Sequence, residues 1–92
     1  MISFKGSYNC EALGASFIEV LVTQSMPISG KPLKDVKVPH GILFAAVVRG
    51  KEIFIPTGKD QVQVDDRIVI FVTNETQKKL EKLLDMKLEF VL

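Results

Sequence analysis

Few side chains in this 92-residue chain are of the types that carry out chemistry. The only histidine, His40, lies in the triplet Pro39-His40-Gly41, and the only cysteine, Cys10, lies in a segment without a sustained hydrophobic period. A nucleophilic cysteine or serine needs a base held beside it, and no motif here orients His40 for that task. We therefore interpret His40 as a solvated turn residue and Cys10 as an inert thiol. One histidine and one cysteine also cannot build the common structural zinc sites, so we expect no metal.

The charged residues are arranged for solvation rather than for catalysis. Asp65 and Asp66 are adjacent, so on an extended segment their carboxylates point to opposite sides and make a poor acid and base pair. The lysines between residues 78 and 82 are interleaved with acidic side chains, which is typical of a solvated helix face.

The sequence lacks the motifs that bind nucleotides, the positive charge that binds nucleic acid, and an apolar run long enough to span a membrane. The six glycines stand at positions 6, 14, 30, 41, 50 and 58, which fits neither a GxGxxG nor a GxxxxGK[ST] motif. A net charge of +1 gives no basic surface for nucleic acid. The longest apolar run, Ile42 to Val48, is far shorter than the roughly 20 residues that cross a bilayer. We expect a domain that is not an enzyme, does not bind nucleic acid and does not insert into the membrane.

Hydrophobic patterning predicts the elements that position these residues. Residues 1–16 are interpreted as a loosely structured lead-in or linker, followed by a strand at 17–22 with Ile18, Val20 and Val22 on its inner face. A short helix or turn is expected near 33–37. The apolar run 42–48 predicts a strand covered on both faces at the centre of the sheet, joined by a tight turn at 49–52 to a strand at 53–55.

The second half of the chain predicts a further strand and a helix. Val62 and Val64 are expected to face inward before a buried strand at 68–72. Asn74 suits a helix N-cap with Gln77 three positions later, and a leucine face follows at positions 80, 83 and 84. Alternation returns at 86–92, which is compatible with an edge strand. The predicted fold is α+β, a small mixed sheet with a short helix and a longer C-terminal helix packed on it, in the order β-α-β-β-β-α.

A series of short motifs resembles a known family. In chain order they are Gly30-Lys31-Pro32-Leu33-Lys34-Asp35-Val36, Pro39-His40-Gly41, Ala45-Ala46-Val47-Val48-Arg49-Gly50, Ile55-Pro56-Thr57-Gly58 and Asp66-Arg67-Ile68-Val69-Ile70-Phe71. The segment 17–92 thereby resembles the C-terminal regulatory domain of the TrkA/RCK proteins, which are cytoplasmic subunits of potassium transporters and channels. One departure is Asp65, where the family usually has glycine, so a positive φ at this position would carry mild strain.

The resemblance implies a ligand-sensing, dimerising module with a membrane potassium transporter or channel subunit as its partner. It implies a cytoplasmic location, held peripheral to the inner membrane through the transporter complex. The alternative left open is the same domain attached to another cation or anion permease or antiporter, or a cyclic di-AMP-binding module. Deletion of residues 87–92 tests whether the tail carries the homodimer.

No cofactor is expected in this chain, because in the family NAD(H) or ATP binds a separate N-terminal Rossmann domain. Cyclic di-AMP is disfavoured, because the short helix has no arginine and the next strand begins Ile42-Leu43 without an asparagine. The resemblance places the candidate ligand-binding residues at Leu33, Val36, Pro39, His40 and Gly41.

Overall fold

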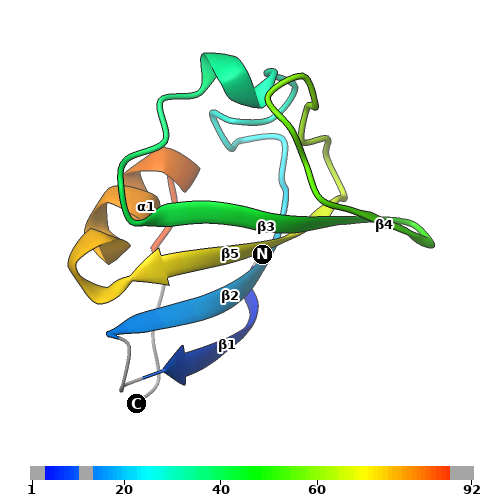
Figure 1. Ribbon diagram of the computed structural model, residues 1–92. Helices are drawn as coiled ribbons and strands as arrows, with labels where there is room; N and C mark the ends of the chain where they lie inside the picture. The colour runs from blue at the N-terminus through cyan, green and yellow to red at the C-terminus, as the bar shows by residue number, and fades with distance from the viewer. Residues whose placement is uncertain (1–3, 11–13, 88–92) are drawn as a thin grey trace.

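The computed structural model describes residues 4–10 and 14–87 of the chain, which form a five-stranded sheet with one α-helix (Figure 1). The strand order is β1-β2-β5-β3-β4, and all four pairings between neighbours are antiparallel. A parallel contact occurs as an isolated bridge between Ser29 and Val62. The α+β fold class predicted from the sequence is confirmed. The elements are β1 Phe4–Cys10, β2 Ala15–Leu21, the 3-10 helix η2 Leu33–Asp35, β3 Ile42–Arg49, β4 Glu52–Phe54, β5 Arg67–Thr73, the 3-10 helix η3 Asn74–Thr76 and α1 Gln77–Leu84.

The core lies between the sheet and α1. Alternate residues of β2 and β5 point into it, because side chains alternate across a strand, and the helix contributes Leu80 and Leu84. The predicted inner face of β2 and the predicted leucine face of the helix are therefore confirmed. The buried apolar cluster consists of Ile18, Val20, Val22, Met26, Ile28, Ile42, Phe44, Val47, Val62, Ile68, Ile70, Val72, Leu80 and Leu84.

The prediction that the run 42–48 occupies the centre of the sheet and is covered on both faces is wrong. The central strand is β5, while β3 lies between β5 and the short strand β4. The side chain of Leu43 remains 60% exposed, because α1 packs on the opposite face. An uninterrupted apolar run was taken as a sign of two covered faces, but here one of those faces is open.

The first strand corrects the interpretation of residues 1–16 as a loose lead-in. Residues Phe4–Cys10 form β1, which pairs with β2 through a register that aligns Tyr8 with Phe17. The segment alternates Phe4, Gly6, Tyr8 and Cys10 with polar residues, which is a strand period that Gly6 obscures. A register irregularity between Phe4 and Gly6 accompanies this glycine.

Three smaller expectations also differ. Val64 is 46% exposed rather than inward, because it lies in the turn that precedes β5. Asn74 begins η3 and is not the N-cap of α1, although its side-chain carbonyl accepts a hydrogen bond of 3.3 Å from Gln77. Within the predicted edge strand 86–92, residues 86 and 87 are not strand and residues 88–92 lie outside the described residues.

Gly41 allows the turn before β3 to approach the start of the helical region closely. Its φ of +96° falls in the region that disfavours L side chains, and an added Cβ would meet the hydroxyl oxygens of Thr73 and Thr76. Those hydroxyls hydrogen-bond each other at 2.6 Å, and the Thr76 hydroxyl donates to the His40 carbonyl. The Gly41 carbonyl accepts a hydrogen bond of 2.9 Å from the Thr73 N–H. This bond holds the turn before β3 against the end of β5.

We expect Gly41→Ala to destabilise the fold by about 2–4 kcal/mol, because backbone strain and steric overlap add together. Gly50→Ala is the matched control: Gly50 also has a positive φ, of +60°, but an added Cβ there would contact nothing within 4 Å. It should cost only about 1 kcal/mol. Urea unfolding of both variants measures the difference, and equal losses would contradict a steric role for Thr73 and Thr76.

Candidate functional site

A buried carboxylate, Asp66, anchors the β3–β4 hairpin to the loop before β5. Arg49 donates two hydrogen bonds to it, from Nε to Oδ1 at 3.0 Å and from Nη2 to Oδ2 at 2.9 Å. The Gln63 N–H donates a third, at 2.9 Å. Arg49 also donates to the Gln61 carbonyl and lies 5.2 Å from the centroid of the Phe54 ring. This bidentate geometry fixes the relative position of three chain segments.

The pair shifts both pKa values in the stabilising direction. Burial alone would raise the pKa of Asp66, but the hydrogen bonds from Arg49 and from the Gln63 N–H outweigh it and lower that pKa. The pKa of Arg49 is raised chiefly by its hydrogen bond to Asp66. The Asp66 side chain is 3% exposed and carries a fully partnered charge, so its role in the described structure is structural.

The neighbouring residue, Asp65, adopts the backbone conformation that the sequence led us to expect. Its φ is +77°, and its N–H donates to the Val22 carbonyl at 3.0 Å. Aspartate tolerates this left-handed conformation better than most residues but less readily than glycine. The turn that aims Asp66 at Arg49 is thus built at a small conformational cost.

A groove of about 190 Å³ lies between the Pro27–Ile28 loop, the segment around η2 and the end of α1. Ile28, Val36 and Leu83 give it apolar walls, while Lys31 and Lys37 bring positive charge and Asp35 a single negative charge. An apolar surface bordered by two lysines suits a small ligand that has an apolar part and an anionic part. This groove is therefore a candidate binding site.

The structure brings only one of the five sequence-predicted site residues to this groove, namely Val36. Leu33 packs against the core, Pro39 is half-buried, and His40 is exposed, as expected of a turn histidine. Gly41 serves the close contact with Thr73 and Thr76. Sequence reasoning missed Ile28 and Leu83, because their contribution depends on the long loop after β2 folding back toward the helix.

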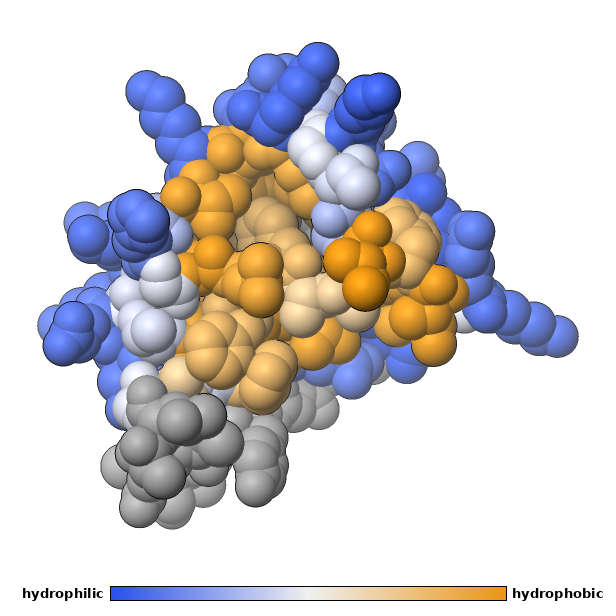
Figure 2. Space-filling model, viewed as in Figure 1, coloured by the Kyte–Doolittle hydropathy of each residue, from blue (hydrophilic) through white to orange (hydrophobic). Residues whose placement is uncertain are grey.

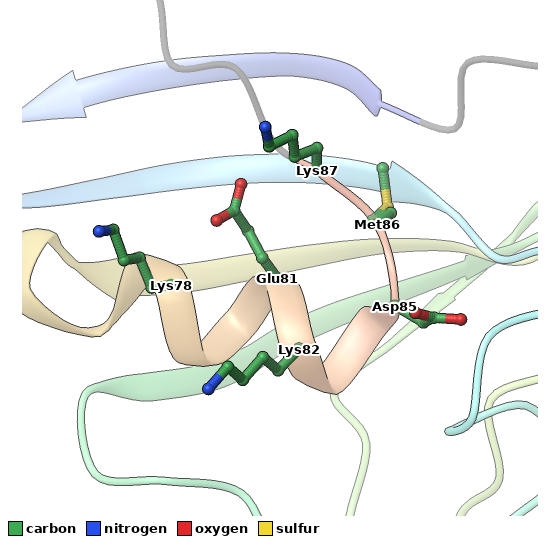
Figure 3. Close-up of a pocket in the computed structure, with 6 residues that line it drawn as sticks. All are labelled: Lys78, Glu81, Lys82, Asp85, Met86 and Lys87. Atoms are coloured by element: carbon green, nitrogen blue, oxygen red, sulfur yellow. The ribbon is translucent and has the colours of Figure 1, made fainter.

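A second, more open hollow of about 420 Å³ lies beside α1 and is lined by Lys78, Glu81, Lys82, Asp85, Met86 and Lys87 (Figure 3). The charged ends of these side chains point in different directions, so they do not converge on one ligand position. Lysines 78, 79 and 82 are exposed, in agreement with the predicted solvated helix face.

Two further properties concern the residues that the structure describes. Within them, no group of three or more histidine, cysteine, aspartate or glutamate side chains is placed to hold a metal ion. No helix among these residues is long and apolar enough to cross a membrane.

Comparison with known proteins agrees with this architecture. The model of the TrkA-C domain matches residues 17–85. A Trk system potassium uptake protein TrkA homolog 1 of Methanosarcina mazei is 44% identical over 68 residues, and the Azorhizobium caulinodans Trk system potassium uptake protein TrkA is 34% identical over 73 residues. These alignments cover 74% and 79% of this chain, which spans only 15% and 16% of the two relatives.

A solved structure described as an RCK domain with cda has a similar fold. The superposition gives a TM-score of 0.61 at 20% sequence identity and covers 74% of this chain and 96% of the other. At this identity the likeness concerns the fold alone.

We expect Asp66→Asn to lower the free energy of unfolding at pH 7 by about 2–3 kcal/mol, because it leaves Arg49 without its anionic partner. The figure lies below that for fully buried pairs because the Arg49 side chain is 34% exposed. Asp65→Asn is the control: Asp65 is exposed and asparagine tolerates its positive φ, so the change should cost less than about 0.5 kcal/mol. Urea unfolding measures both.

The same comparison, repeated across pH, tests the lowered pKa of Asp66. A carboxylate whose native pKa lies below its unfolded value of about 3.9 stabilises the fold above that value, and the gain disappears as pH falls through the native pKa. The stability gap between the unmodified chain and Asp66→Asn should therefore be constant from pH 5 to 8 and shrink below about pH 4. A gap that grew on acidification would contradict this sign.

Proposed function

Because the chain belongs to the TrkA-C domain family, we propose that it acts as a regulatory domain of a potassium uptake or channel system. The observation that carries the proposal is the family match over residues 17–85, together with relatives that are Trk system potassium uptake proteins. We place the domain in the cytoplasm, peripheral to the inner membrane, with a membrane potassium transporter or channel subunit as its partner. It is proposed to regulate without catalysing a reaction.

The proposed mode of action is ligand sensing coupled to association of two copies. A ligand shifts an equilibrium only if it binds the two states with different affinity. A groove whose walls come from separate segments, such as Ile28, Val36 and Leu83, meets that condition when those segments move relative to one another. NAD(H) or ATP, if used by the system, is assigned to a separate Rossmann domain and not to this groove.

We propose that the groove at Val36 takes a small organic anion. Its apolar walls favour the uncharged part of the ligand, and Lys31 and Lys37 favour the anionic part. Its volume of about 190 Å³ is below the roughly 300 Å³ at which drug-sized ligand pockets begin, so part of a ligand the size of AMP is proposed to remain in solvent. Cyclic di-AMP remains the disfavoured ligand, since no arginine occurs between Leu33 and Lys37.

A thermal-shift series with AMP, ATP, NADH and cyclic di-AMP tests this groove. We expect AMP to raise the melting temperature and cyclic di-AMP to leave it unchanged. A ligand at 100 times its dissociation constant adds about 2.7 kcal/mol, which corresponds to a rise of roughly 11–22 °C for a domain of this size. The double variant K31E/K37E should lose the shift, and the control K51E/K59E, with two exposed lysines outside the groove, should retain it. A shift that persists in K31E/K37E would contradict binding here.

A chimera tests the proposed place in potassium uptake. Residues 17–85 replace the matched segment of the Methanosarcina mazei TrkA homolog 1, and the chimera is expressed with its transporter in a strain deficient in potassium uptake. We expect growth at limiting potassium to match that of the unmodified homolog. A chimera carrying Asp66→Asn should support less growth, because the domain is destabilised. A folded chimera that gives no potassium-dependent growth would count against the proposed function.

A further inference from the structure

The face of the sheet opposite α1 is an extended apolar surface. Figure 2 shows apolar side chains gathered at the centre of this face over β2, β5 and β3, with charged side chains around its margin. The exposed fractions are 40% for Phe17, 60% for Leu43 and 71% for Ile53. Phe17 and Phe71 pack edge to face with their centroids 4.8 Å apart. We call this surface the open face.

The strand register orders the open face into three rows. The first row runs Phe17, Phe71, Leu43 across β2, β5 and β3, and the second runs Glu19, Val69, Ala46. The third runs Leu21, Arg67, Val48, and Ile53 of β4 continues it. Two charges therefore interrupt an otherwise apolar surface, with Val69 of the central strand in the middle.

The two charges are only loosely paired within one copy. Arg67 Nη1 lies 3.8 Å from Glu19 Oε2, and the side chains are 45% and 39% exposed. A long, solvated ion pair of this kind contributes little to the stability of a single chain. Both charges therefore remain available to a second partner that approaches the open face.

We propose that the open face is the interface of a homodimer in which two sheets pack face to face with their strands nearly orthogonal. The inference rests on the dimer proposed above and adds its surface and geometry. In a twofold dimer each patch meets its own copy, so the face must be complementary to itself. A second copy is the occupant that the charge pattern specifies.

The register distinguishes the possible twofold axes through Val69. An axis along the strands sets Arg67 against the partner's Arg67, and one across the strands sets Glu19 against the partner's Glu19. One diagonal axis covers Glu19 with the partner's Phe71. The other diagonal sets Glu19 against the partner's Arg67, twice by symmetry.

The favoured diagonal also matches the apolar side chains by size. It places Phe71 over the partner's Ala46, so that a large side chain meets a small one, and Phe17 over the partner's Val48. A diagonal axis makes the strands of the two sheets cross at nearly 90°, which is one of the two common sheet packings. Charge and shape therefore select the same arrangement.

The area suits a reversible dimer. The strands β2, β5 and β3 are seven or eight residues long and about 4.8 Å apart, and with the three-residue β4 beside them they give a flat footprint of roughly 400 Å². Because side chains protrude from this plane, the accessible area of the face is larger than its flat footprint. The accessible area thus approaches the roughly 800 Å² per partner of standard interfaces. We expect dimerisation to depend on protein concentration.

Sedimentation velocity of the full 92-residue chain over a concentration series tests the face. Leu43→Glu should weaken dimerisation at least tenfold. Val64→Glu, which adds the same charge at an exposed valine in the turn before β5 rather than in the three rows, should not. Circular dichroism and thermal unfolding establish that each variant is folded. If the wild-type chain dimerises and folded Leu43→Glu dimerises equally well, the interface is wrong while the proposed dimer stands. A wild-type chain that stays monomeric throughout overturns both.

Charge exchange tests the geometry. Glu19→Arg and Arg67→Glu should each weaken the homodimer, because like charges then face each other twice. An equimolar mixture of the two variants should form a heterodimer, since both contacts become opposite in charge, and Glu19→Arg/Arg67→Glu should dimerise like the wild type. Glu19→Gln should weaken the dimer if Glu19 meets Arg67, whereas a stronger dimer would indicate that Glu19 faces Glu19 and would overturn the diagonal arrangement.

Discussion

The small size of the helical layer is the constraint on which the rest of this structure depends. In the described part of the chain α1 is the only α-helix, and its eight residues span only about 12 Å. It covers the part of the sheet where Leu80 and Leu84 reach the β5 side chains. The long segment between β2 and β3 adds Met26 and Ile28 to the same core, so one face is sealed by a helix and a loop together. No comparable segment of the described chain is left for the second face.

The hydrophobic period of the sequence predicted correctly those elements whose burial pattern is visible within a few consecutive residues. The alternation in 17–22 identified the inner face of β2, and the resemblance to a family that usually has glycine in place of Asp65 pointed to the positive φ found there. The same reasoning failed where a neighbour decides the environment. The uniform apolar run of β3 cannot reveal that Leu43 lacks a covering layer, and the ion pair between Arg49 and Asp66 joins residues 17 positions apart. The groove was missed for the same reason, since only Val36 carried a local signal.

The candidate ligand groove and the open face lie on opposite sides of one strand layer. Leu83 borders the groove and belongs to the helix whose Leu80 and Leu84 pack on β5, while Val69 and Phe71 of β5 form the middle of the open face. A ligand that moved the end of α1 would therefore alter the support beneath the proposed dimer surface. Coupling free energies of 1–3 kcal/mol are typical between such sites. In the proposed sensor, only α1 and the sheet therefore separate the ligand groove from the open face.

The brevity of β4 has a consequence for how copies of this domain avoid polymerising. An edge strand with free backbone groups can recruit the edge of another sheet, and repetition of that contact produces open-ended fibrils. Here β4 pairs through only three residues, and Pro56, which has no N–H to donate, follows two positions after the strand ends. This edge is a poor template for a growing ribbon. Contact through a sheet face with twofold symmetry, by contrast, closes after two copies.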